Sequence, residues 1–391
     1  MNAMPHEPVR RYLVELATAW ANRAEGPVAP PPGFEPEQHA PALRAALLAH
    51  NVEVPLGALL PPPLREAGFE AQVATSRART TALLLEAERI LPLVGRHAER
   101  PVLLKGAALA LRTYPEPAQR WFLDLDLLVP RPAVGPICRE LEHAGYRPLP
   151  GGRDPRFYEK YHLHRILLGP AGACVEVHWD LTLPGSVYHL SASGVTARAR
   201  ADQLGRQHVW RPCAVDQVLH ATYQNIADGW LDLRRVLDLA LLVPALSPGE
   251  QKMLAELARH SGLERALALS LHVVKCVAGV GDEAAGSLER ALGPAAWRMA
   301  RGLDVVGGCL DRRGRSVEGY TALLHLLSTP RGAQRWRELG RLLWVGEERL
   351  LDMGHQASAL PGLWVRTRVG AHQVLTAARM GAMAGRALIA P

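Results

Sequence analysis

Cysteine is scarce in this chain of 391 residues, and the few cysteines present follow no ligand pattern. The five are Cys138, Cys174, Cys213, Cys276 and Cys309, widely scattered and without a C-x-x-C pair. An odd number at such spacings argues against a disulfide framework and against a structural zinc site. A chain of this length can bury a sizeable core without such cross-links. We therefore expect a globular protein of a reducing compartment, the cytoplasm.

Long apolar runs are also missing. The best candidate, VLDLALLVPAL, is interrupted by Asp238 and Pro244, as expected of a buried helix end. The first twenty residues contain no uninterrupted apolar stretch followed by a small-residue cleavage site. We expect neither a membrane span nor a secretion signal.

Neither sign of charge dominates strongly. Lys and Arg number 45 against 38 Asp and Glu, which gives +7. This balance favours anionic ligands such as nucleotides but is too diffuse to indicate nucleic acid. The segment RGAQRWRELGRLLW at 331–344 interleaves arginine with tryptophan, a pattern compatible with RNA binding. A solvated basic face over an apolar stripe explains the pattern as well, so nucleic acid is not the favoured partner.

Changes in hydrophobic period divide the chain into three parts. Residues 1–98 predict a helical segment that packs on the core, and residues 213–391 predict a C-terminal helical domain. Between them, 99–212 predicts a core with strands at 102–105 and 121–129, followed by a helix and a hairpin. The expected fold class is α+β, a small mixed β-sheet core flanked by N-terminal and C-terminal helical segments.

Two carboxylates share one face of the strand WFLDLDLLV. Because side chains alternate along a strand, Asp124 and Asp126 project together while Leu125 and Leu127 line the other face. Like charges so close repel unless a cation neutralises them, and Mg²⁺ prefers oxygen ligands. An exposed strand face with two solvated aspartates is an equally good explanation of D-x-D alone.

A third carboxylate, Glu176, lies on the strand ACVEVHW, with His178 on the same face. If the hairpin loop at 169–173 is symmetric, Ile166 pairs with Glu176 and His164 pairs with His178. The histidines His162, His164 and His178 would then stand beside carboxylates. A zinc or iron site is one interpretation, polar lining is the bland one, and contact with phosphate or with Glu176 is a third.

Phosphate-binding groups are expected beside these carboxylates. Gly106 opens a helix whose backbone amides can approach a triphosphate, because glycine has no side chain to block them. Lys105 and Arg120 add cations, although each is equally explained as a surface residue. Farther along the chain, His220, Asp232 and Asp238 are candidates for lining a pocket or for bracing helices.

Here the sequence resembles a known family. The run LLKGAALALRTYPEPAQRWFLDLDLLV, then LEHAGY and VEVHWDL, is similar to the uncharacterised nucleotidyltransferase family of the polymerase-β-like superfamily. The resemblance covers about residues 65–245. It implies the family's glycine at Gly106, its metal-binding pair at Asp124 and Asp126, and its third carboxylate at Glu176. Many nucleotidyltransferases have Gly-Gly or Gly-Ser where this chain has Gly106-Ala107, so a hydroxyl contact to phosphate is missing.

The function expected from these residues is Mg²⁺-dependent transfer of a nucleoside monophosphate from a nucleoside triphosphate, such as ATP, with release of pyrophosphate. The base is unspecified, and the acceptor is a hydroxyl or phosphate of a small molecule, peptide or protein. A catalytically silent nucleotide-binding scaffold and an RNA-modifying nucleotidyltransferase or toxin are the alternatives. The catalytic residues, which hold two Mg²⁺ ions, are expected to be Asp124, Asp126 and Glu176. The nucleotide-binding or phosphate-binding residues are expected to be Lys105, Gly106, Arg120, His164 and His178.

Overall fold

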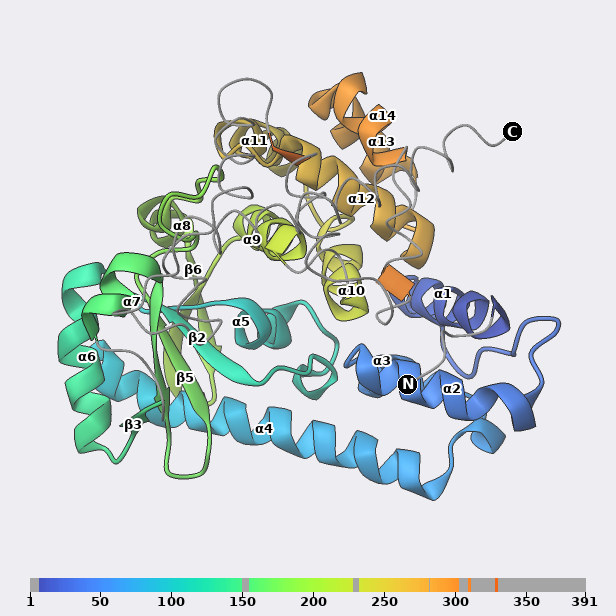
Figure 1. The fold of residues 1–391 in the computed structure, drawn as a ribbon, viewed down its shortest axis with the longest axis horizontal. Coiled ribbons are helices and arrows are strands. Elements are labelled where there is room, and N and C mark those ends of the chain that lie inside the picture. The colour runs from blue at the N-terminus through green and yellow to red at the C-terminus, as the bar shows by residue number, and fades with distance from the viewer. Residues whose placement is uncertain are drawn as a thin grey trace, which may run out of the picture.

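The computed structural model describes residues 7–149, 155–227, 232–280, 282–301, 309–310 and 328–329. In these residues a seven-stranded mixed sheet is surrounded by helices (Figure 1), which confirms the predicted α+β class. No helix in this part of the chain is both long enough and apolar enough to cross a membrane.

The sheet has the strand order β3-β4-β5-β2-β1-β7-β6. Its strands are β1 Val102–Leu103, β2 Asp124–Leu128, β3 Arg147–Pro148, β4 His164–Leu168, β5 Cys174–His178, β6 Arg200–Leu204 and β7 Gln207–Arg211. The central pair, β2 and β5, is parallel, whereas β4 and β5 form an antiparallel hairpin. Strand β1 is antiparallel to β2 and parallel to β7.

The hairpin register predicted from the sequence is confirmed: Ile166 pairs with Glu176 and His164 with His178. Strand β2 begins at Asp124, three residues later than predicted, and the preceding Leu123 is 44% exposed. Strand β1 ends before Lys105, because Lys105 is already the first residue of a helix. The edge hairpin of β6 and β7 was not anticipated from the sequence.

Helices precede and follow the sheet in the chain, as predicted. The N-terminal ones are α1 Glu7–Ala21, α2 Pro36–Ala49, α3 Glu53–Gly57, the 3₁₀ turn η1 Pro62–Leu64 and α4 Ala67–Gly95. The helices between the strands in the chain are α5 Lys105–Arg112, η2 Pro117–Gln119, α6 Arg131–His143, α7 Pro155–Tyr161 and α8 Ala192–Arg198. The later ones are α9 Ala214–Ala227, α10 Leu233–Leu242, α11 Pro248–His260, α12 Glu264–Ala278, α13 Asp282–Leu292 and α14 Pro294–Arg301. Ser247 and Glu250 form a capping box at the start of α11.

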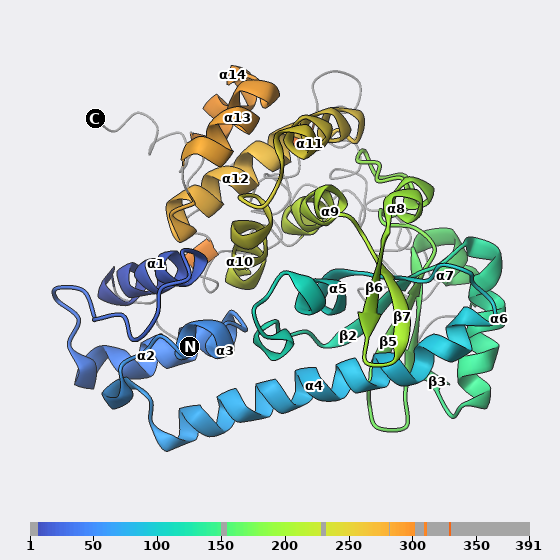
Figure 2. The ribbon, with the colours of Figure 1, turned by 180° about the vertical axis from the view of Figure 1, so that it is seen from behind.

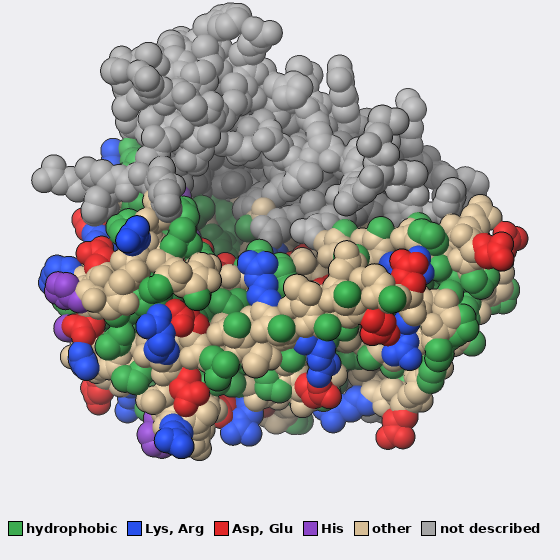
Figure 3. Space-filling model, turned by 90° about the horizontal axis from the view of Figure 1, so that it is seen from below, with side chains coloured by type: hydrophobic (Ala, Val, Ile, Leu, Met, Phe, Trp, Pro, Cys, Tyr) green, Lys and Arg blue, Asp and Glu red, His purple; other side chains and the backbone are tan. Residues whose placement is uncertain are grey.

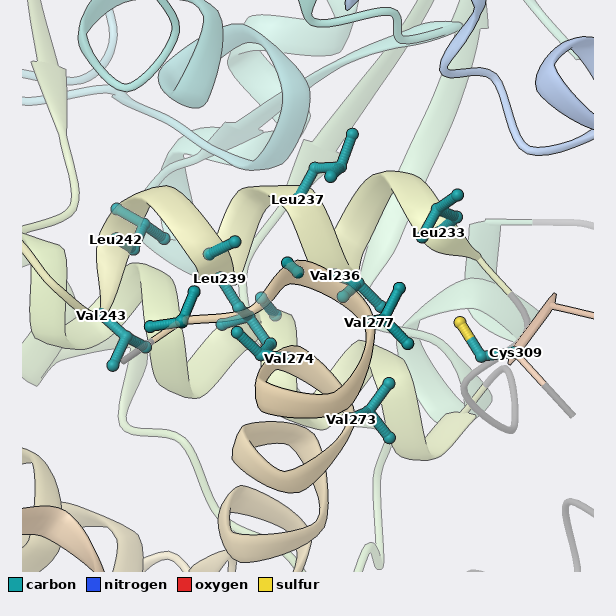
Figure 4. Packing of buried hydrophobic residues seen from close by; sticks show 14 of the residues in the cluster. Leu233, Val236, Leu237, Leu239, Leu242, Val243, Val273, Val274, Val277 and Cys309 are labelled. Atoms are coloured by element: carbon teal, nitrogen blue, oxygen red, sulfur yellow. The ribbon is translucent and has the colours of Figure 1, made fainter. Parts of the chain in front are cut away.

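Two hydrophobic clusters lie on either side of the sheet. One packs Leu125, Leu127 and Val175 against α4 and α6, and α4 runs beneath the sheet along the length of the molecule (Figures 1 and 2). The larger cluster joins α1 and α2 to α9, α10 and α12. Figure 4 shows part of this cluster, where Val236 and Leu239 of α10 lie near Val277 and Val274 of α12. Helix α5 lies between the sheet and α9 and α10 (Figures 1 and 2).

The face covered by α4 has mixed charge. In Figure 3 acidic and basic side chains are interspersed across this face among the described residues, without a broad basic surface. Ion pairs such as Arg89 with Glu86 and Arg77 with Glu116 account for part of the mixture. On this side the net charge of +7 is therefore not gathered into a surface for nucleic acid.

Candidate active site

Three carboxylates meet on the two central strands. Because β2 and β5 are parallel neighbours, Asp126 lies directly beside Glu176, and Asp124 lies one alternate position earlier on the same face. One oxygen from each of the three side chains lies within 4.8 Å of the others. The structure thus brings together the three carboxylates that the sequence predicted to share a site.

Burial of the opposite face explains why they meet. Leu125 and Leu127 are fully buried against α4 and α6, and a shift of one residue would bring both to the other side of the sheet. Asp126 is only 1% exposed, so its charge requires compensation nearby. The hydrophobic pattern of the strand therefore fixes where the carboxylates point.

Lys105 supplies part of that compensation. Its Nζ forms an ion pair with Asp126 and lies 3.5 Å from Glu176 Oε2. The residue has φ of 47°, a left-handed conformation that is uncommon outside glycine and costs free energy. Burial lowers the pKa of Lys105, but the charges of Asp126 and Glu176 outweigh burial and raise it above its usual value. The lysine is therefore charged and held against the carboxylates.

Two histidines complete the cluster. His178 Nε2 lies 2.8 Å from Asp126 Oδ1 and 3.0 Å from Glu176 Oε2. His164 Nδ1 lies 3.5 Å from the same Glu176 oxygen, and the His164 and His178 rings meet edge to face with centroids 4.7 Å apart. His162 was also predicted to stand beside the carboxylates. Its ring centroid is 6.0 Å from that of His164.

Burial and neighbouring charges separate the proton affinities of these groups. Burial and the charge of Asp126 raise the pKa of Asp124 to about 6. Burial acts in the same direction on Asp126, but Lys105 and the hydrogen bond from His178 outweigh it and hold the Asp126 pKa far below its usual value. Burial lowers the pKa of His164 to about 4, so this imidazole is neutral at pH 7. For His178, burial is outweighed by hydrogen bonds to Asp126 and Glu176, and the pKa is raised.

The start of α5 adjoins this cluster. No side chain caps its first amides, which leaves backbone N–H groups for an anion. Gly106 has a second reason to be glycine, because a Cβ there would lie 2.3 Å from Phe122 Cβ. Ala107 is 1% exposed and belongs to the cluster packed against α4, so a serine hydroxyl at this position would face the core. The missing hydroxyl is therefore explained by the packing of this helix.

Arg120 is committed to the fold. Its guanidinium is buried and donates to both oxygens of Asp238 at 2.6 and 2.7 Å, and Tyr114 donates to the same carboxylate at 2.8 Å. A further donor reaches the Trp121 carbonyl. Among the described residues its hydrogen bonds go to these groups and not to the three carboxylates of the cluster. The sequence left open whether Asp238 lines a pocket or braces a helix. In the structure it braces α10 by accepting hydrogen bonds from Arg120 and Tyr114.

Arg234 was not singled out in the sequence. Its guanidinium stacks over the Trp121 ring at 5.3 Å, donates to the Trp121 carbonyl at 3.2 Å and pairs with Asp232 at 2.6 Å. Its Nε is buried without a hydrogen-bond partner. No sequence signal distinguishes Arg234, because only the folding of α10 against the sheet brings it to Trp121. Asp232 caps α10 through the Arg234 backbone N–H.

His220 of α9 is the remaining sequence candidate. It is buried, and burial together with the charge of Lys105 lowers its pKa to about 3. Its helix, α9, contacts α5, the helix that begins at Lys105. The arginine and tryptophan segment at 331–344 lies outside the described residues.

Three carboxylates beside a lysine and an uncapped helix start define a class of site, one suited to a divalent cation and a polyphosphate. Residues 39–279, well over half of the chain, match the family described as uncharacterised nucleotidyltransferase. The chain therefore belongs to this family, and its predicted resemblance is confirmed. Membership supports nucleotidyl transfer as its activity. No curated protein and no solved structure matches the chain.

Proposed function

We propose that the protein transfers a nucleoside monophosphate from a Mg²⁺-bound nucleoside triphosphate to an acceptor hydroxyl or phosphate and releases pyrophosphate. The observation that carries the proposal is the cluster of Asp124, Asp126 and Glu176, whose oxygens lie within 4.8 Å of one another. Family membership and the adjoining start of α5 support it.

The donor set fits the cation that this chemistry uses. Oxygen ligands at this spacing suit Mg²⁺, and Asp126 Oδ2 is buried without a hydrogen-bond partner. Asp124, Asp126 and Glu176 would hold one or two Mg²⁺ ions, which neutralise phosphate charge and lower the pKa of an acceptor hydroxyl. The protein supplies the placement of these oxygens in a water-poor setting.

The phosphates of the nucleotide are assigned to the start of α5. Its uncapped amides at Gly106 and its neighbours donate to a phosphate oxygen, and the helix dipole favours the negative charge. Lys105 contributes its ammonium group, and His164 and His178 border the same space. We add Arg234 to this set, because it packs on Trp121, three residues before Asp124. Arg120 supports the set indirectly, since both arginines donate to the Trp121 carbonyl.

In the proposed reaction an acceptor oxygen forms a bond to the α-phosphorus. The bond between that phosphorus and the oxygen bridging to the β-phosphate breaks, and pyrophosphate leaves with the electron pair. When the acceptor is a hydroxyl, its proton passes to Glu176, whose side chain is 13% exposed against 1% for Asp126. A phosphate acceptor has no proton to transfer at this step.

Two alternatives remain distinguishable by experiment. The missing hydroxyl at Ala107 suggested a catalytically silent nucleotide-binding scaffold. Burial of Ala107 in the hydrophobic cluster is a sufficient reason for an alanine at this position, so the residue is no sign that activity was lost. An RNA-modifying enzyme or toxin was suggested by residues 331–344 alone. The oxygen cluster favours catalysis over the scaffold, because a scaffold has no need of three converging carboxylates.

The first test is calorimetric titration of the four ribonucleoside triphosphates, with Mg²⁺, into wild type and the Asp124→Asn/Asp126→Asn double variant. We expect Mg²⁺-dependent binding of at least one nucleotide to wild type, lost in the double variant while circular dichroism shows an intact fold. Glu142→Gln, an exposed carboxylate on α6, is the control and should bind as wild type does. Unchanged Mg²⁺-dependent binding by the double variant would contradict the assignment.

Turnover is tested separately with Asp126→Asn. With an acceptor that supports pyrophosphate release by wild type, we expect this variant to lose at least about a hundredfold in kcat. Nucleotide binding without pyrophosphate release, across hydroxyl and phosphate acceptors, would favour the scaffold.

A further inference from the structure

Glu176 has two different neighbourhoods. It lies within 4.8 Å of oxygens of Asp124 and Asp126, and also of a ring nitrogen each of His164 and His178. The nitrogen atoms and a Glu176 oxygen also lie within 4.8 Å of one another. One carboxylate therefore belongs to an all-oxygen group and to a group with two nitrogens.

The two histidines are placed by the sheet itself. His164 and His178 are cross-strand partners in the hairpin of β4 and β5, so the pairing register fixes their separation. His178 is 2% exposed; its Nε2 contacts Asp126 and Glu176, and its other ring nitrogen, Nδ1, has no hydrogen-bond partner. His164 Nδ1 lies 3.5 Å from Glu176 Oε2 but forms no well-aligned hydrogen bond. Buried nitrogens without partners cost free energy unless a ligand satisfies them.

We propose that His164, His178 and Glu176 form a second cation site, selective for a divalent first-row transition ion over Mg²⁺. Imidazole nitrogen suits Mn²⁺, Fe²⁺, Co²⁺, Ni²⁺ and Zn²⁺, whereas Mg²⁺ prefers oxygen throughout its coordination shell. Glu176 bridges this site to the oxygen group of Asp124 and Asp126. The site does not depend on the proposed function, because the ion binds without a nucleotide.

Lys105 and the proposed ion compete for one atom. The lysine Nζ and the His164 Nδ1 are each 3.5 Å from Glu176 Oε2, so the ammonium charge repels a cation bound there. Removing this charge should strengthen ion binding, an effect opposite in sign to the loss of a histidine.

The test uses Co²⁺ alone as a probe, because its visible absorption reports the ligands around it. Full-length protein stripped with chelator is titrated with Co²⁺ without nucleotide, and Mg²⁺ is titrated in parallel by calorimetry. We expect about one Co²⁺ per chain at the nitrogen group, with affinity above that for Mg²⁺. His164→Gln and His178→Gln should each weaken Co²⁺ binding roughly tenfold or more, since each removes a ligand.

Three further variants separate this site from its neighbours. Asp124→Asn should leave the Co²⁺ spectrum in place, and Lys105→Met should raise Co²⁺ affinity several-fold. His208→Gln, an exposed histidine on β7, is the matched control and should bind as wild type does. Absence of bound Co²⁺, a spectrum unchanged in His164→Gln, or loss of Co²⁺ in Asp124→Asn would each overturn the proposal. His164 is partly exposed, so His164→Gln decides the matter even if His178→Gln does not fold.

Discussion

Gly106 shows how one residue can satisfy two constraints at once. The sequence assigned it to phosphate binding, and the structure places its α-carbon against Phe122. Both explanations require the absence of a side chain. They differ in what a substitution would change, because packing affects stability even without nucleotide.

We expect Gly106→Ala to lower the free energy of unfolding by about 1–3 kcal/mol, the usual cost of overpacking a buried position. The new Cβ would lie 2.3 Å from Phe122 Cβ, and Phe122 is itself buried. Urea unfolding without nucleotide measures the change. Gly249→Ala in α11 is the control, since a Cβ there meets nothing within 4 Å, and it should be neutral or slightly stabilising. Equal stability of Gly106→Ala and wild type would refute the packing explanation.

At the scale of elements, a buried ion pair joins the chain entering β2 to α10. Arg120 and Asp238 are both buried, and each hydrogen bond between them is charge-assisted. Such a pair contributes less than its Coulomb attraction because both charges lose their hydration. Removing one partner is far more costly than removing both.

We expect Asp238→Ala to destabilise the protein by about 3–5 kcal/mol, because the Arg120 charge is left buried and unpaired. The Arg120→Met/Asp238→Leu double variant should recover most of this loss. Chemical unfolding of the three proteins measures the difference. If the double variant is no more stable than Asp238→Ala, the pair does not act as the structure indicates. Retained nucleotide affinity in the double variant would exclude direct phosphate binding by Arg120.

A second set of ion pairs fastens α5 to the edge hairpin. Asp202 of β6 accepts from Arg112 of α5 at 2.9 Å and from Arg211 of β7 at 2.7 Å. Burial raises the pKa of Asp202, but hydrogen bonds from Arg112, the Gln203 backbone and Arg211 outweigh it and lower the pKa to about 2. In the unfolded chain the pKa is about 3.9. The stabilisation is therefore complete above about pH 5 and disappears as the pH falls through about 2.

We expect Asp202→Asn to cost about 1–2 kcal/mol of unfolding free energy at pH 6, and clearly less at pH 3. Urea unfolding of wild type and variant at the two pH values gives this comparison. Glu142→Gln, on an exposed position of α6, should show no such difference between the two pH values. A cost independent of pH would mean that the carboxylate charge is not what stabilises the hairpin.

On the scale of the whole molecule, the predicted division into three segments does not coincide with the hydrophobic clusters. Leu13 and Leu47, from the N-terminal segment, lie in the same cluster as Leu237 and Val277 of the C-terminal helices. The Thr18 hydroxyl of α1 also donates to the Val277 carbonyl. The segments before and after the sheet therefore share one core.

This shared core predicts a single cooperative unfolding transition for the part of the chain that it includes. Leu13→Ala should lower the free energy of that transition by about 2–5 kcal/mol, because Leu13 is fully buried. Leu85→Ala is the control, since Leu85 is 62% exposed and its loss should change little. Far-ultraviolet circular dichroism and tryptophan fluorescence should give coincident curves. A second transition, affected by Leu13→Ala alone, would show that the N-terminal helices unfold independently.

Much of the site was predictable because alternation along a strand is strictly local. The positions of Leu125 and Leu127 determine the face on which Asp124 and Asp126 lie, without reference to the rest of the fold. The hairpin register followed from the loop length between 168 and 174 in the same way. The strands of the edge hairpin were missed because they are polar and carry few apolar residues to reveal the alternation of a strand.

By itself, the sequence determined the α+β class, the family, the capping box of α11 and the shared face of the three carboxylates. Only the tertiary structure decided which cations serve those carboxylates. Arg120 lies four residues before Asp124 yet is engaged by Asp238, whereas Lys105, at the start of α5, pairs with Asp126 and Glu176. The physical reason is reach: strand geometry sets side-chain direction over a few residues, whereas the partner of a buried charge depends on how distant helices pack against the sheet.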